Sequence, residues 1–195
     1  MYNKEGELKL KNSKVKDLMV SLSKYATVDE TATLFDAVLA LEKAQAAYQG
    51  TKYPHRAILV LDTNGNVSGK VSQMDVLRAL EPKYAEMQEN SNLAMYGFSS
   101  KFIKSLVNYY NLWDSPLTDL CRKAGEISVT KFMRKPAEGE YIDEDASLDE
   151  AIHQLVCGYH QSLLVTKDNK ITGILRLTDV FDYIGDSMKQ CVIKS

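Results

Sequence analysis

The chain contains two copies of one sequence unit. Four short segments of its first half recur in the same order in its second half, and such self-similarity indicates a duplicated supersecondary unit. The matched pairs are 15–19 with 129–133, 28–34 with 142–148, 57–60 with 162–165, and 69–75 with 173–179. One unit of this size forms a sheet too small to bury both of its faces. The duplication therefore predicts two similar units that pack back to back.

Each copy has the same predicted order of elements: strand, helix, strand, strand and helix. Thr33 and Ser147 each precede an acidic residue by three positions and an apolar stripe at helical spacing, which indicates the start of a helix. The apolar stripes are Leu34, Ala37, Val38 and Leu41 in one copy and Leu148, Ala151, Ile152 and Leu155 in the other. Two short apolar runs follow in each copy, and Asn64-Gly65 between the first two is a hairpin signal. A second helix follows each hairpin.

The composition favours a soluble protein and excludes several partners. Hydrophobic residues make up 45% and charged residues 26% of the 195 residues, which is the balance of an ordinary globular protein. No apolar run approaches the roughly 18 residues of a membrane span, and the first residues lack the apolar core of a signal peptide. We therefore expect a cytoplasmic protein with no membrane partner. Because the net charge is −2 and no basic stripe stands out, we expect no nucleic-acid partner.

The sequence contains no recognisable catalytic motif. Its three cysteines and three histidines have neither the spacing of a zinc site nor that of a disulfide framework. There is no phosphate loop of the Walker type and no recognisable pair of nucleophile and base. The acidic run 143–145 leads into a capped helix and is expected to face water. We predict a non-catalytic protein that requires neither a metal nor a cofactor.

The order of elements, the pair of units and the Gly-x-x-Ser/Thr-x-x-Asp pattern that closes each hairpin resemble the cystathionine β-synthase (CBS) repeat, found in tandem as the Bateman module. The resemblance covers 10–82 and 127–190. It implies an α/β (α+β) fold of two β-α-β-β-α repeats packed with pseudo-twofold symmetry, plus a helical insertion between them. The predicted segments are an N-terminal segment 1–9, repeat 1 at 10–82, the insertion at 83–126 and repeat 2 at 127–195.

A candidate nucleotide site lies at the end of the first hairpin. Gly69 lets backbone come close, Ser72 supplies a hydroxyl where a helix begins, and Asp75 follows one turn later. A helix N-terminus attracts phosphate through its free N–H groups. In the family that this chain resembles, the Ser/Thr position contacts phosphate and the Asp binds the ribose hydroxyls, so we predict these roles for Ser72 and Asp75. The same spacing is also that of a capping box, which is the structural alternative.

The second repeat departs from the pattern. Arg176 stands where Ser or Thr is expected, whereas Gly173 and Asp179 are kept. The arginine could clamp a phosphate with its fork of donors, or it could fill the cleft and pair with Asp179. We favour an altered or vacant second site, and therefore one bound nucleotide per chain.

The resemblance also implies where the base lies. It places the base between the strand that enters the first helix and the strand that follows that helix. The residues concerned are Thr27, Val28, Ala57 and Ile58 in repeat 1, and Ile142, Ser162 and Leu163 in repeat 2. Ordinary core packing is the alternative interpretation, above all for Val28, Ile58 and Leu163. His55 and Arg56, just ahead of a strand, are further candidates for contact with phosphate.

The insertion 83–126 has no counterpart in the duplication. Ser99 or Ser100 can cap a helix that carries apolar and aromatic residues at spacings of three and four. These are Phe102, Leu106, Tyr109, Tyr110 and Trp113. Ser115-Pro116 predicts the start of a second helix. A hairpin packed on its own module or on a dimer mate is one interpretation, and a docking surface for a regulated partner is the other.

Two functions follow from these predictions. The first is a regulatory module that senses an adenine nucleotide (AMP, ADP or ATP), or S-adenosylmethionine, in the cleft between the repeats and passes a change of packing to a partner protein. The second is a scaffold that has lost the ligand and keeps the fold for dimerisation or docking. Isolated Bateman modules pair face to face, so the resemblance implies a homodimer. The sequence identifies neither the adenosine compound nor the regulated partner.

Overall fold

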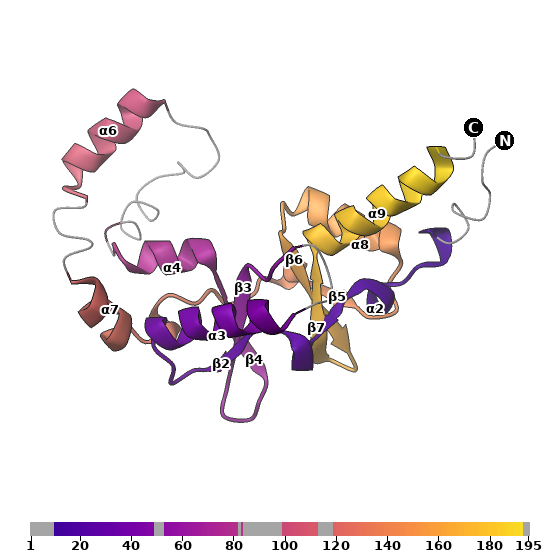
Figure 1. Ribbon diagram of the computed structural model, residues 1–195, viewed down its shortest axis with the longest axis horizontal. Helices are drawn as coiled ribbons and strands as arrows, with labels where there is room; N and C mark the ends of the chain where they lie inside the picture. The colour runs from indigo at the N-terminus through magenta and orange to yellow at the C-terminus, as the bar shows by residue number, and fades with distance from the viewer. Residues whose placement is uncertain (1–9, 49–52, 82, 84–98, 113–118, 193–195) are drawn as a thin grey trace.

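The computed structural model of the protein describes residues 10–48, 53–81, 83, 99–112 and 119–192 (Figure 1). They form two α/β halves that lie side by side. The first half consists of β2 (Thr27–Asp29), α3 (Leu34–Ala47), β3 (Ala57–Leu61), β4 (Val67–Ser72) and α4 (Gln73–Ala79). The second consists of β5 (Tyr141–Asp143), α8 (Leu148–Cys157), β6 (Ser162–Lys167), β7 (Lys170–Arg176) and α9 (Leu177–Val192). The predicted order of elements is confirmed in both halves.

Local signals place the helix starts and the turns. In the first half, Asp36 N donates to Thr33 Oγ1 at 3.2 Å and Thr33 N donates to Asp36 Oδ2 at 2.8 Å, which completes the predicted capping box. Ser147 Oγ accepts from Glu150 N at 3.2 Å in the second half. The second hairpin turns through Asp168 and Asn169, whose φ angles of 48° and 62° are those of a two-residue type I′ turn.

The two sheets share one topology. In each half the first strand is parallel to the second, and the second is antiparallel to the third. The register of the antiparallel pair shifts between Val60 and Leu61 in one half and between Val165 and Thr166 in the other. These are corresponding positions of the repeat. The duplication seen in the sequence therefore extends to an irregularity of the backbone.

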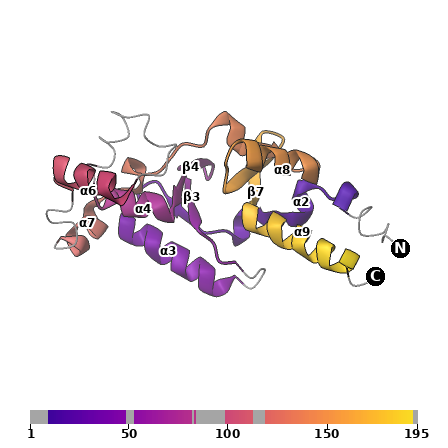
Figure 2. The same cartoon turned by 90° about the horizontal axis from the view of Figure 1, so that it is seen from above.

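Each half is completed by a segment that precedes the other half in the sequence. The segment before the first half forms α2 (Val15–Leu18), β1 (Val20–Ser21) and the 3-10 helix η1 (Leu22–Lys24). Strand β1 pairs with β7 of the second half, and both views show α2 among the elements of that half (Figures 1 and 2). Reciprocally, the segment that contains η3 (Val129–Lys131) bonds to the first half through the bridges Thr33–Ser128 and Lys70–Arg134. The halves exchange their N-terminal segments.

The cores confirm the exchange. Val15 is fully buried in the core of the second half, against Leu148, Leu163 and other apolar residues of that half. Val129 is fully buried in the core of the first half, with Ile58. A third cluster joins the halves and consists of Val20, Tyr25, Leu59, Leu164 and Ile174. The predicted segments 10–82 and 127–195 thus describe the repeat of the sequence, whereas each packed core includes residues of the other copy.

Two glycines make room for the exchanged segments. A Cβ at Gly69 would lie 2.5 Å from Met133 Sδ, and a Cβ at Gly173 would lie 2.5 Å from the carbonyl oxygen of Val20. Both distances are far below van der Waals contact. The space that Gly69 leaves open is therefore taken by the Met133 side chain of the exchanged segment, and not by the backbone approach that we predicted.

The insertion is helical where the structure describes it. Helix α6 (Ser100–Tyr109) begins at Ser99, whose Oγ accepts from Phe102 N at 3.2 Å, as predicted. The predicted start of the next helix at Ser115-Pro116 lies outside the described residues, and α7 is described as Leu120–Glu126. Helix α7 packs against α3 (Figure 2). This end of the insertion therefore lies on its own module.

Candidate functional site

Ser72 and Asp75 meet at the junction of β4 and α4. Ser72 N and Oγ donate to Asp75 Oδ2 at 2.8 and 2.6 Å, and Asp75 N donates to Ser72 Oγ at 3.2 Å. The capping alternative is thus realised in this structure. Gln73 N is also occupied, because it donates to the Arg56 carbonyl at 3.1 Å. Helix α4 has only seven residues, and its first turn keeps few N–H groups for a phosphate.

The Asp75 carboxylate lies between two arginines. Arg134 Nε donates to Oδ1 and Oδ2 at 3.1 and 3.2 Å, and Arg78 Nη1 lies 3.3 Å from Oδ1. The Asp75 side chain is 3% exposed, whereas that of Arg134 is 53% exposed. The guanidinium groups supply the positive charge that a buried carboxylate needs. Sequence reasoning missed Arg134, although it directly follows the repeated segment 129–133.

A second ion pair lies on the same face of β4. Lys70 Nζ is bonded to Glu140, and both residues are buried. Burial alone would raise the pKa of Glu140, but the hydrogen bond and charge of Lys70 outweigh it and lower the pKa below its ordinary value. Lys70 and Ser72 point to the same side of the sheet because side chains alternate along a strand. The first half therefore presents a charged surface to the second half beside Ser72.

The corresponding position of the second half is closed. Arg176 Nε and Nη2 donate to Asp179 Oδ2 and Oδ1 at 2.6 and 2.5 Å. Both side chains are 5% exposed. This fork-to-fork pairing occupies the edge of the carboxylate that would accept ribose hydroxyls. Of the two roles considered for Arg176, pairing with Asp179 is the one seen in this structure.

Aromatic residues of the first half surround the Arg176 guanidinium. Arg176 Nη1 lies 3.2 Å from His55 Nδ1 and donates to the Tyr53 carbonyl at 3.1 Å. The Tyr48 ring centre lies 5.2 Å from Arg176 Cζ, within cation–π range. The rings of Tyr25 and Tyr48 lie 4.5 and 4.3 Å from that of His55. Arg176 thus crosses between the repeats and fills the space beside Asp179.

His55 is neutral in this cluster. Burial and the charge of Arg176 lower the pKa of His55 to about 4, and Asp179 and the backbone of Lys24 oppose this shift without cancelling it. Arginine has donors only, so Nδ1 accepts and the ring proton lies on Nε2. In the described part of the chain, Nε2 has no partner in hydrogen-bonding geometry. No sequence motif indicated this cluster, because its members come from separate loops and helices.

The residues predicted to hold the base divide between two faces of the sheet. Ala57 pairs directly with Ser72, and Thr27 pairs with Leu59, so Thr27, Ala57 and Ser72 share the face that meets the second half. Val28 and Ile58 point the other way, into the core of the first half. Ile142 and Leu163 likewise lie in the core of the second half, while Ser162 is buried beside Arg176 in the strand register. The structure thus brings Ala57, Ser72 and Asp75 together, whereas Thr27 lies on the same face two strands away from Ser72.

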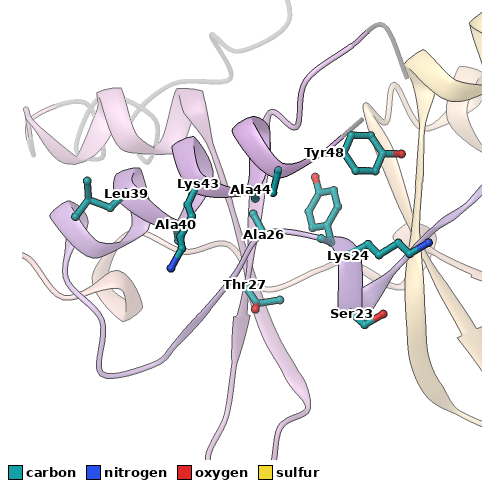
Figure 3. Close-up of a pocket in the computed structure, with 11 residues that line it drawn as sticks. Ser23, Lys24, Ala26, Thr27, Leu39, Ala40, Lys43, Ala44 and Tyr48 are labelled. Carbon is teal, nitrogen blue, oxygen red and sulfur yellow. The ribbon is translucent and has the colours of Figure 1, made fainter. Parts of the chain in front are cut away.

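An open groove of about 920 Å³ lies between α3 and the segment that contains η1 and the start of β2 (Figure 3). Small apolar side chains of α3 line one wall, and Lys43 and Lys24 lie at the rim. Tyr25 and Tyr48 of the aromatic cluster also line it. Thr27 is the one predicted site residue among the lining residues, so the groove is separate from the Ser72–Asp75 junction.

The described ranges hold neither a candidate metal cluster nor a candidate membrane-spanning helix. No cluster of three or more His, Cys, Asp or Glu side chains there is arranged to hold a metal ion. The helices described are too short or too polar for any of them to span a bilayer.

Comparison with known proteins identifies the fold family. The family model of the CBS domain matches residues 15–82 and 125–186. A CBS domain-containing protein of unknown function from Bacillus anthracis is similar, with a TM-score of 0.59, 18% identity, and coverage of 92% of this chain and 98% of that chain. In one longer neighbour the chain spans 60% of the length. No curated protein matches the chain.

Two similar structures contain nucleotides. CBSX2 in complex with AMP has a TM-score of 0.54 and 19% identity, and the match covers 90% of this chain and 98% of that chain. The CBS domain of a bacterial CNNM/CorC family Mg²⁺ transporter in complex with ATP has a TM-score of 0.58 and 12% identity, and the match covers 93% of each chain. At these identities the similarity establishes the fold alone.

Proposed function

Because the chain belongs to the CBS domain family, we propose that it is a regulatory module that binds an adenine nucleotide through its first repeat. The neighbours solved with AMP and with ATP support this ligand class. The observation that carries the proposal is the geometry at Asp75, where a carboxylate and the Ser72 hydroxyl lie on the face between the repeats, beside the exposed guanidinium of Arg134. These groups can accept ribose hydroxyls and bind phosphate.

One nucleotide per chain is the expected stoichiometry. In the second repeat, Tyr25 and Arg176 fill the space beside Asp179. By the offsets of the duplication, Tyr25 corresponds to Gly139 and Arg176 corresponds to Ser72. The site at Asp75 therefore has smaller side chains at the two positions that close the second site.

The regulatory effect would pass through the packing of the repeats. A ligand can shift an equilibrium only through different affinities for two states, and the proposed site lies beside the exchanged segment that ties the halves together. We propose that the module is a cytoplasmic homodimer that acts on a partner protein without catalysis and needs no cofactor. Exposed apolar side chains on its helices offer surfaces for such contacts. They include Phe35, Leu39, Met74, Leu77, Phe181 and Met188.

A ligand-free scaffold is the second candidate. It is favoured by the complete capping box, which satisfies Ser72 and Asp75 without any ligand. The same exposed apolar side chains would then serve dimerisation or docking alone.

A thermal-shift panel tests the proposal with AMP, ADP, ATP and S-adenosylmethionine, and with GMP and phosphate as controls. A ligand at about 100 times its Kd stabilises the fold by about 2.7 kcal/mol, which raises Tm by roughly 5–11 °C for a chain of this size. We expect a shift with adenine compounds that is lost in Asp75→Ala. Asp36→Ala is the matched control, because it removes the capping carboxylate of α3 and leaves the site intact. A flat panel on folded, nucleotide-free protein would favour the scaffold.

A further inference from the structure

The Asp75 carboxylate has no free position for a ribose. Ser72 N and Ser72 Oγ donate to Oδ2, Arg134 Nε contacts both oxygens, and Arg78 Nη1 contacts Oδ1. Two carboxylate oxygens offer about four lone-pair positions. A ribose diol must therefore displace one of these donors.

Arg134 is the group whose departure frees both carboxylate oxygens at once. The contacts from Ser72 belong to the capping box, and Arg78 touches one oxygen at 3.3 Å. Arg134 covers both oxygens, yet its side chain is 53% exposed, so water can solvate the released guanidinium. Its backbone remains fixed, because Arg134 N and O bond to Lys70 O and N at 2.9 Å each. The side chain can therefore swing while its Cα stays beside the site.

The phosphate of a nucleotide needs a donor at the same place. Asp75 N and Gln73 N, at the start of α4, are already bonded. Lys70 is paired with Glu140. The Arg134 side chain hydrogen-bonds to Asp75 alone among the described residues, so its planar fork becomes available once the ribose has displaced it.

We propose that Arg134 has two positions: it neutralises Asp75 when the site is empty and binds the ligand's phosphate when the ribose takes Asp75. This inference rests on the proposed function and names the residue that makes the site specific for phosphorylated nucleosides. A nucleoside without phosphate breaks the Arg134–Asp75 pair and offers the displaced guanidinium no new partner. The exchanged segment thus senses the ligand directly, because Arg134 belongs to the stretch that follows η3.

Isothermal titration calorimetry with AMP and adenosine tests the proposal on the full chain. In Arg134→Gln we expect AMP to bind about tenfold more weakly, as for the loss of one charged hydrogen-bond donor. Adenosine should bind several-fold more tightly, because its competitor for Asp75 is gone. The two affinities therefore move in opposite directions. Arg134→Lys, which keeps the charge and loses the fork, should lie between the two.

Two control variants separate this movement of Arg134 from general effects of charge. Arg122→Gln removes an exposed arginine that pairs with Asp119 and Glu126 on α7, and neither affinity should change. Lys131→Gln removes an exposed cation of the same exchanged segment, at the end of η3, and neither affinity should change. Thermal melts of each variant establish that it is folded.

Each other pattern overturns the inference. If Arg134→Gln tightens both compounds, Arg134 only blocks the site. If it weakens AMP and leaves adenosine unchanged, Arg134 is a simple phosphate contact. If it changes neither, Arg134 takes no part in binding. A wild-type chain that binds neither AMP nor the other adenine compounds of the panel contradicts the proposed function as well. AMP binding with a wrong pattern in Arg134→Gln contradicts this inference alone.

Discussion

At the residue scale, the second repeat keeps a buried ion pair where the first offers a site. Arg176 and Asp179 are both almost fully buried, and such a pair tolerates burial only when its remaining donors are satisfied. The Tyr53 carbonyl, His55 Nδ1 and the Tyr48 ring meet this requirement. A histidine can serve here only as a neutral acceptor, which explains why its protonation opposes folding.

Acid should therefore destabilise the protein through His55. Its pKa is about 4 in the folded chain and 6.5 in its ordinary state, so between these values the unfolded chain binds a proton that the folded chain excludes. The stability that neutral His55 contributes is fully present above about pH 6.5 and is lost as the pH drops toward 4. The groups that face the ring are Arg176, Asp179, Tyr25 and Tyr48.

We expect urea unfolding to give a free energy about 2 kcal/mol lower at pH 5 than at pH 7 from this residue. His55→Gln should lose that part of the pH dependence, whereas the exposed His153→Gln should retain it. Equal pH slopes in wild type and His55→Gln would contradict the assignment.

At the element scale, the exchanged segments leave no room for a side chain at Gly69 of β4 and Gly173 of β7. Gly173→Ala should destabilise the fold by about 2 kcal/mol or more, because the added Cβ meets the Val20 backbone and packed backbone cannot move cheaply. Gly69→Ala should cost less, since it meets the flexible side chain of Met133. Gly125→Ala in α7 should stabilise by about 0.5–1 kcal/mol, because its Cβ meets open space. Chemical unfolding ranks the three variants, and equal costs at Gly173 and Gly125 would refute the packing argument.

Local signals in the sequence sufficed for most elements and for part of the site. Strand β3 (Ala57–Leu61) and the capped starts of α3, α6 and α8 were predicted, because period and capping act within a few residues. The CBS fold is confirmed by the family match. The spacing of Ser72 and Asp75 could not separate a cap from a ligand site, because both uses need the same residues. Arg134 and the cluster around Arg176 escaped prediction, since tertiary packing alone brings their members together.

At the scale of the whole molecule, the packing unit differs from the repeat of the sequence. The core of the first half needs Val129, and that of the second half needs Val15. We expect the fragment 22–134, which contains Val129, to unfold cooperatively in a thermal melt followed by circular dichroism. The fragment 10–82, which lacks it, should not. Val129→Asp in 22–134 is the control and should abolish the transition. A cooperative melt of 10–82 would show that the exchanged segment is dispensable.

The exchange also dictates the order of events during synthesis. A nascent chain cannot close its first core until Val129 has been synthesised. Strand β1 must wait longer, because its partner β7 closes the hairpin of the second repeat. Contacts of such long sequence separation, like the bridge between Lys14 and Ser147, slow folding. Neither half can therefore complete its core before the other copy has been synthesised, and the two halves must fold together.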